Sequence, residues 1–144
     1  MTLLEILGAI ANAATAVGVG VAAWQLVIGR RQAAIAFEDS FTTQYRALID
    51  RIPMQALLGE QLRPDELQEL LPYFYRYFDL CNEQAFLHKH GRVSLATWAE
   101  WKDGIVTNIG RPAFRAAWSE VACRAPHDFD HLRELCPPAP VTCT

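Results

Sequence analysis

The stretch EILGAIANAATAVGVGVAAWQLVIGRR, residues 5–31, places 24 uncharged positions between Glu5 and Arg30. Only a few of these positions carry clearly polar side chains: Asn12, Thr15 and Gln25. About 20 residues at a rise of 1.5 Å cover a hydrocarbon core of about 30 Å. Trp24 lies near the end of the run, where interfacial aromatic residues are found. We therefore predict a transmembrane helix within residues 1–29.

Two other interpretations of this segment stay open from the sequence. A cleavable signal peptide needs a basic start and a small-residue cleavage site. Val21, Ala22 and Ala23 would provide the site, but the start carries Glu5 and no basic residue. A buried helix of a soluble domain is the second alternative, because the many Ala and Gly residues make the segment less hydrophobic than a Leu-rich span.

Basic residues lie on one side of the segment only. None precedes it, and Arg30 and Arg31 follow it directly. The positive-inside rule therefore predicts a single pass, with the C-terminal domain in the cytoplasm.

Small residues recur every four positions along the predicted span, at Gly8, Asn12, Ala16 and Gly20. Such a ridge lets helix backbones approach closely, and Asn12 needs a hydrogen-bond partner inside lipid. We therefore predict an oligomer interface at these positions. If several copies meet, Asn12 and Thr15 would instead line a narrow polar pore. The alternative is that an Ala-rich span produces such a ridge by chance.

The rest of the chain has only helical periodicity, so the predicted fold class is all-α, with the transmembrane helix continuing into a cytoplasmic helical bundle over residues 30–135. Pro64 early in one helix, Ser94 as an N-cap and Gly91 as a C-terminal cap mark helix ends. A last helix is expected over residues 128–135. Pro137, Pro138 and Pro140 predict an extended tail over residues 136–144.

Charge and cysteine content exclude several classes of function. The net charge is −3 and there is no basic stripe, so we expect no nucleic-acid partner. The four cysteines show no CxxC pair, and in a cytoplasmic domain reduced thiols are expected. The expected partners are membrane lipid, further copies of the chain and a protein not specified by the sequence. No cofactor is expected.

One polar line stands out in the aromatic helix around residue 78. Arg76, Asp79 and Glu83 share a face and Asn82 is adjacent. We predict a buried ion-pair network that fixes helix register. The same four residues could instead line a ligand pocket, and the sequence does not decide between the two.

The sequence offers no signature of catalysis or metal binding. His127 and His131 have a spacing that can hold one metal ion, but a third ligand is lacking, so a solvated polar face is predicted. There is no nucleophile elbow and no phosphate-binding glycine loop. We assign neither catalytic residues nor a metal site.

The string YFYRYFDLCNEQAFL at residues 73–87 and the later layout of Gly91, Trp98, Trp101, Pro112 and Trp118 carry a resemblance. The chain resembles a group of small, uncharacterised bacterial proteins with an N-terminal membrane helix and an aromatic-rich helical domain. Its plan is also similar to the accessory membrane pore protein of type VI-B CRISPR systems. These resemblances imply the bacterial inner membrane and a role in phage defence.

The helical domain of that CRISPR accessory protein is related to HEPN ribonucleases, whose motif is Arg followed four to six residues later by His. Arg124 lies three residues before His127 and seven before His131, so this chain departs from the motif.

Three hypotheses follow from the sequence. The first is a non-enzymatic, membrane-anchored protein that self-associates and forms an oligomeric pore or membrane effector. The second is a membrane-tethered scaffold or sensor that binds a protein or nucleotide through its helical domain. The third is an atypical HEPN-like nuclease that uses Arg76, Asp79 and Glu83.

Overall fold

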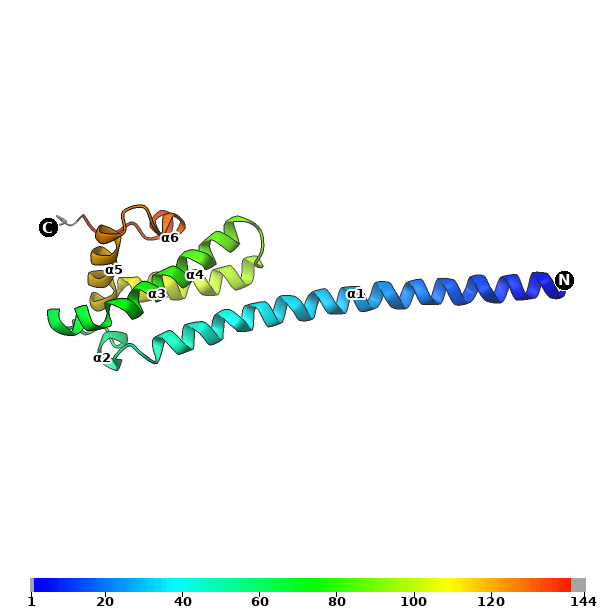
Figure 1. Ribbon diagram of the computed structural model, residues 1–144, viewed down its shortest axis with the longest axis horizontal. Coiled ribbons are helices and arrows are strands. Elements are labelled where there is room, and N and C mark those ends of the chain that lie inside the picture. The colour runs from blue at the N-terminus through cyan, green and yellow to red at the C-terminus, as the bar shows by residue number, and fades with distance from the viewer. Residues whose placement is uncertain (1, 141–144) are drawn as a thin grey trace. The chain divides into compact units, whose positions relative to one another are not determined.

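A computed structural model describes residues 2–140, except for the side chain of Ala9, and this range contains helices and no strand. The helices are α1 (Leu3–Ile49), α2 (Met54–Leu57), α3 (Pro64–Lys89), α4 (Leu95–Gly110), α5 (Pro112–Arg124) and α6 (Asp130–Leu135) (Figure 1). The predicted all-α fold class is confirmed.

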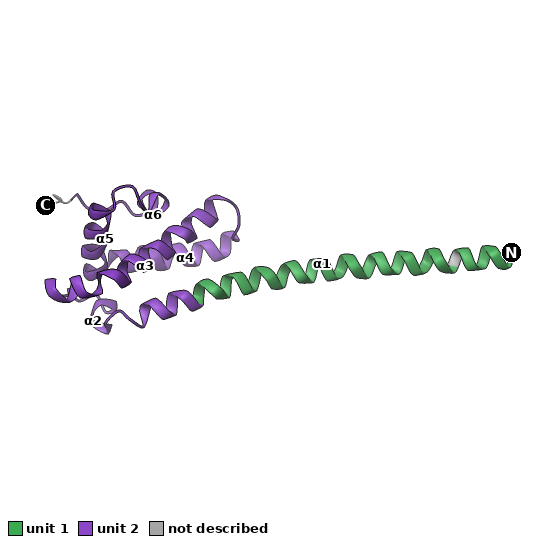
Figure 2. Cartoon of the chain, in the orientation of Figure 1, with its two compact units in different colours: residues 1–42 green, residues 43–144 purple. Residues whose placement is uncertain are grey.

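The chain divides into two compact units, residues 1–42 and residues 43–144 (Figure 2). The division falls inside α1, which runs through Gly29, Arg30 and Arg31 without a break. No structural feature marks residue 29, so the limits of the membrane segment stay a prediction. Residues 141–144 of the predicted tail lie outside the described residues.

Local sequence explains where the helices of the second unit begin and end. Pro64 is the first residue of α3, and the Glu66 side chain accepts a hydrogen bond from the Arg63 backbone N–H at 3.2 Å. Gly91 follows the end of α3 with a φ of 65°, a conformation that glycine adopts without steric cost. Ser94 caps α4 by accepting from the Thr97 N–H at 3.0 Å. These three predicted helix ends are confirmed.

Helix α3 is the centre of the second unit and packs against α4, α5 and α6. Its buried face carries Phe74, Tyr77 and Phe78. The Phe74 ring meets Phe114 of α5 edge-on at 5.0 Å, and the Phe78 ring lies 4.9 Å from that of Trp118. All five rings are at most 1% exposed, so these aromatic contacts form the middle of the core.

The connection from α5 to α6 adopts an unusual backbone conformation. Phe129 has a φ of 65°, which costs a bulky residue of the order of 1–3 kcal/mol. Its buried ring packs edge-on against Tyr75 at 5.1 Å and Trp118 at 5.8 Å. Arg133 donates to the carbonyls of Ala122 and Ala125 at 2.8 Å each, so it also caps the end of α5. These contacts hold the strained turn in place.

The cysteines differ in state. Cys81 is a buried free thiol and Cys136 is a half-buried one. Cys123 is disulfide-bonded, which contradicts the reduced thiol expected from a cytoplasmic location. Cys143 lies outside the described residues.

We predict that the short α6 is held by one leucine. Leu132 is 0% exposed in the core, whereas Leu95 at the start of α4 is 78% exposed. Leu132→Ala should lower the free energy of unfolding by about 2–5 kcal/mol, and the matched Leu95→Ala should change it by less than about 0.5 kcal/mol. Denaturant unfolding followed by tryptophan fluorescence measures both. Equal effects of the two substitutions would contradict the docking of α6.

Candidate functional site

Helix α1 is long and apolar enough to span a membrane, and none of its most apolar 18-residue window is buried by the rest of the chain. Large apolar side chains along it are open, with Ile10 61%, Val17 66% and Trp24 69% exposed. Within the described residues this window is therefore not buried, and the membrane span itself stays a prediction.

The predicted ridge of Gly8, Asn12, Ala16 and Gly20 is exposed along α1. A Cβ atom built on Gly8 or Gly20 would meet nothing within 4 Å, so neither glycine is required by the packing of the single chain. The Thr15 hydroxyl donates to the Ala11 carbonyl at 2.9 Å, and its hydrogen-bonding need is met within the helix. The ridge is therefore available for contact, and its role as an interface or pore lining stays a prediction.

The prediction that charged residues on α3 form a buried network is wrong, because these residues are exposed. Arg76, Asp79 and Glu83 are all exposed, and none of the three forms an ion pair within residues 2–140. Helix α3 buries Tyr77, Phe78 and Cys81 instead. Each residue advances about 100° around a helix, so a shift of one residue changes the face that is buried. Packing of α3 against three other helices buries the face next to the predicted one.

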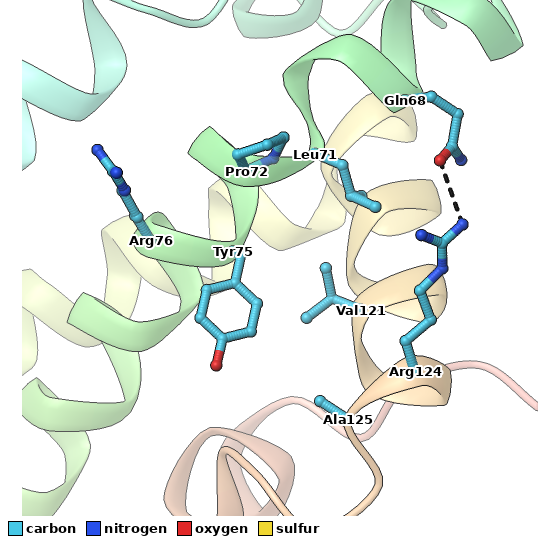
Figure 3. Close-up of a pocket in the computed structure, with 8 residues that line it drawn as sticks. All are labelled: Gln68, Leu71, Pro72, Tyr75, Arg76, Val121, Arg124 and Ala125. Atoms are coloured by element: carbon cyan, nitrogen blue, oxygen red, sulfur yellow. Dashed lines mark hydrogen bonds between the residues drawn. The ribbon is translucent and has the colours of Figure 1, made fainter.

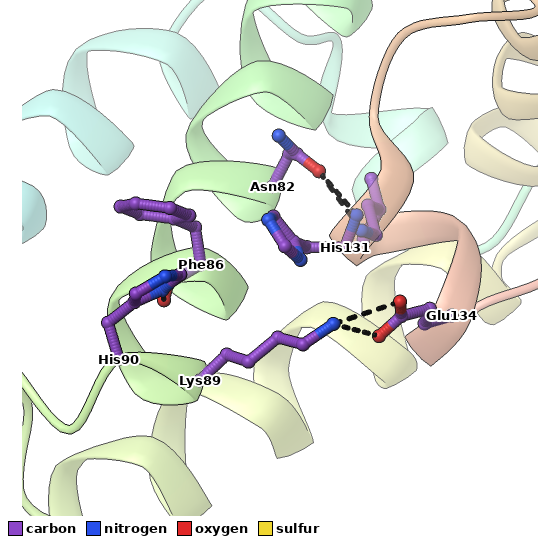
Figure 4. A network of polar contacts seen from close by, with 7 residues as sticks. Asn82, Phe86, Lys89, His90, His131 and Glu134 are labelled. Atoms are coloured by element: carbon purple, nitrogen blue, oxygen red, sulfur yellow. Dashed lines mark hydrogen bonds and ion pairs between the residues drawn. The ribbon is translucent and has the colours of Figure 1, made fainter.

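The fourth residue of that line has a structural role. The half-buried Asn82 side chain accepts hydrogen bonds from the backbone N–H groups of His131 and Leu132, at 3.0 and 3.1 Å (Figure 4). These N–H groups belong to the first turn of α6, where the helix itself offers no acceptor. Asn82 therefore ties α6 to α3.

The exposed charges of α3 do line a groove. Arg76, Asp79 and Glu83 surround a cavity of about 330 Å³ together with Gln44, Ala47 and Leu48 from the end of α1. The pocket interpretation of these residues is thus compatible with their positions, and a bound ligand stays a prediction. One guanidinium and two carboxylates face solvent here, so their mutual attraction is weakened by water.

A partly buried polar network lies elsewhere, between α1, α3 and α4. The Asn108 amide donates to the Tyr77 hydroxyl at 3.0 Å and to the Tyr45 hydroxyl at 3.4 Å. Its oxygen accepts from Arg111 at 2.7 Å. Sequence reasoning missed this network because Asn108 looks like an ordinary polar residue on an exposed helix face.

Histidines gather beside α6 without forming a metal site. The His131 ring lies 5.4 Å from Phe86 and 6.5 Å from His90, and Lys89 forms an ion pair with Glu134 at 3.0 Å (Figure 4). The His90 Nδ1 atom is engaged by the Phe86 carbonyl at 2.8 Å. Among the described residues, no group of three or more His, Cys, Asp or Glu side chains is placed to hold a metal ion.

A second cavity, of about 440 Å³, lies between α3 and α5 (Figure 3). Helix α3 supplies most of its lining, and α5 with the residue that follows it supplies the rest: Gln68, Leu71, Pro72, Tyr75, Arg76, Val121, Arg124 and Ala125. Arg124 donates to the Gln68 side chain at 3.2 Å across the mouth. The sequence contains no signal for this cavity, because its two walls are about 50 residues apart in the chain.

Comparison with known proteins adds no assignment: no family, curated protein or solved structure matches the chain.

We predict that burial of Tyr77 and Cys81 weakens the fold at high pH. Burial raises the pKa of the Cys81 thiol to about 12 and holds the pKa of Tyr77 well above its ordinary range. The unfolded thiol ionises near pH 8.5–9, so the stabilisation is complete below that pH and is lost as pH rises towards 12. Denaturant unfolding between pH 8 and 11 measures this loss.

The control for this prediction is Cys81→Ser, which keeps a hydrogen-bonding group but removes the titrating thiol. Its free energy of unfolding should fall less steeply with pH than that of the unsubstituted protein. Identical pH slopes would contradict a role of Cys81.

Proposed function

We propose that the chain is a membrane-anchored, non-enzymatic helical protein whose copies associate through α1. The single observation that carries the proposal is an uncharged, apolar helix segment of which no part is covered by the rest of the chain. Removing apolar surface from water is worth about 25 cal/mol per Å², so such a segment is strongly driven into a cover. A hydrocarbon layer provides that cover, because the backbone of a continuous helix already satisfies its own hydrogen bonds.

Self-association is supported by the residues that the ridge presents. Gly8, Ala16 and Gly20 allow a second helix backbone to approach closely. Asn12 is exposed and carries an amide that hydrocarbon cannot solvate. A neighbouring copy would offer the missing partner. In a larger assembly the same amides would form a polar ring within the membrane, and the proposed effector activity is a pore along this ring.

The proposed location is the bacterial inner membrane, with a single pass and the helical domain in the cytoplasm, where the Cys123 disulfide would have to be reduced. Arg30 and Arg31 support this orientation because they follow the uncharged segment directly and no basic residue precedes it.

We predict that leucine at the ridge disrupts assembly in a face-dependent way. Gly20→Leu should reduce the particle mass of the full-length protein in mild detergent towards that of a monomer, because the larger side chain separates the backbones. Gly18→Leu is the matched control: it has the same open surroundings, but two residues correspond to about 200° around the helix. Gly18→Leu should keep the oligomer mass.

Asn12→Leu should also reduce leakage of a small dye from liposomes that contain the protein, if Asn12 lines the pore. If the unsubstituted protein is a monomer, self-association is contradicted. If it is an oligomer that causes no leakage, the membrane anchor is still supported but the pore is contradicted.

We predict that the two ends of α1 are accessible from opposite sides of the membrane. In spheroplasts, which lack the outer membrane but keep the inner membrane intact, a membrane-impermeant maleimide should label Thr2→Cys. The same reagent should label Glu60→Cys, which lies beyond α2, only after permeabilisation. Both introduced thiols replace exposed residues, so the two variants are matched for reactivity. The opposite labelling pattern would reverse the proposed orientation.

A further inference from the structure

The cavity between the end of α1 and α3 is lined by charged side chains that no other described residue pairs with. Its volume is about 330 Å³, at the small end of the range of about 300–1,000 Å³ that is typical of ligand pockets. Arg76, Asp79 and Glu83 line it, and none of the three forms an ion pair or a side-chain hydrogen bond within residues 2–140. All three charged groups are therefore open to a ligand from outside the chain.

The guanidinium of Arg76 is free to bind a carboxylate. Arg76 also borders the cavity between α3 and α5, but its side chain points away from the other residues that line that cavity (Figure 3). The guanidinium of Arg124, in contrast, is bound by Gln68 and Glu120. A guanidinium presents five N–H donors in a planar fork that matches the two oxygens of a carboxylate. Of these two arginines, Arg76 is therefore the one that can bind such a group.

Apolar side chains complete the wall of this cavity. Ala47 and Leu48 come from the end of α1, and Leu80, which is 5% exposed, comes from α3. Such a wall can cover an aliphatic stem while the charged ends of the same molecule stay in water, as the stems of lysine and arginine side chains do on protein surfaces. A ligand of the cavity therefore combines an aliphatic stem with charged ends.

The charges follow one another along α3 at fixed steps. A helix rises about 1.5 Å per residue, so Arg76 lies about 4.5 Å to one side of Asp79 along the axis and Glu83 lies about 6 Å to the other. In free arginine the carboxylate and the ammonium share one carbon atom, and five bonds of about 1.5 Å place the guanidinium about 6 Å away when the side chain is extended. The order of carboxylate, ammonium and side-chain cation in the ligand thus matches the order of Arg76, Asp79 and Glu83.

We propose that this cavity binds a free basic amino acid of the arginine class. The α-carboxylate pairs with Arg76, the α-ammonium with Asp79 and the side-chain cation with Glu83. A ligand of one charge fits less well, because an anion would meet two carboxylates and a polyamine would place a cation beside Arg76. Each pair contributes little alone, since the three side chains stay in contact with water, and selectivity comes from forming all three together. This site is independent of the proposed self-association through α1.

Saturation-transfer NMR on the full-length protein in nanodiscs of zwitterionic lipid tests the proposal, with L-arginine as the probe and empty nanodiscs as the blank. Three analogues each lack one charge of the probe. Agmatine lacks the carboxylate, Nα-acetyl-L-arginine lacks the α-ammonium and L-citrulline lacks the side-chain cation. Each should bind about three- to fivefold more weakly than L-arginine, because one exposed ion pair is lost. The acetylated analogue also distinguishes a free amino acid from an arginine at the end of a peptide.

Three variants and one control assign the charges to residues. Glu83→Gln should weaken L-arginine about three- to fivefold and leave L-citrulline unchanged, and Arg76→Gln should weaken L-arginine equally and leave agmatine unchanged. Ala47→Trp fills the cavity, keeps all three charges and should abolish binding. Glu100→Gln removes an exposed carboxylate of α4 and should change nothing. All four positions are exposed, so the variants should fold, and circular dichroism verifies this.

Several outcomes would overturn the proposal. A signal from L-arginine no larger than that of empty nanodiscs would show that the protein does not bind it. Equal binding of L-citrulline and L-arginine would remove the role of Glu83, and equal binding of the acetylated analogue would exclude a free amino acid as the ligand. Binding that survives Ala47→Trp would place the probe outside the cavity. None of these results depends on the oligomer mass, so a failure of self-association would be seen separately.

Discussion

The structure depends on one constraint: α1 exposes apolar surface that the rest of the chain leaves uncovered. A helix that satisfies its own backbone hydrogen bonds and carries almost no charge is stable in hydrocarbon and unfavourable in water. The rest of the chain covers none of its most apolar window. The cover must come from outside the chain, and the proposals of a membrane location and of contact between copies both follow from this requirement.

The second unit solves a different problem, because its helices must bury their apolar surface against one another in a domain of about 100 residues. Helix α3 does this by placing aromatic rings on the face that meets α4, α5 and α6. A core of this kind leaves room for few polar groups. Asn108 donates to the buried Tyr77 hydroxyl and to the hydroxyl of the exposed Tyr45, so polar atoms of three helices share one amide. That arrangement links the end of α1 to the centre of the domain.

The exposed sides of α3 carry the features open to ligands. Arg76 lies between two cavities and contributes to both. The cavity beside α1 mixes one cation with two carboxylates, which favours no single charge of ligand. The cavity beside α5 has a mainly apolar body, and the guanidinium of Arg124 at its mouth is already bound by Gln68 and Glu120. The two surfaces therefore differ in the chemistry that they can recognise, although they share one helix.

The sequence by itself determined the elements whose signals are local. Proline, serine and glycine at helix ends act within one turn, so Pro64, Gly91 and Ser94 could be interpreted without knowing the fold. The uncharged run before Arg30 is likewise a property of consecutive residues. Tertiary structure decided which face of α3 is buried, because apolar residues lie almost all round this helix and periodicity alone does not choose among them. The predicted polar line of Arg76, Asp79 and Glu83 therefore faces solvent, and Asn108 lies in the core. The cavity at Arg124 was also decided by tertiary structure, since its walls meet only when α5 packs on α3.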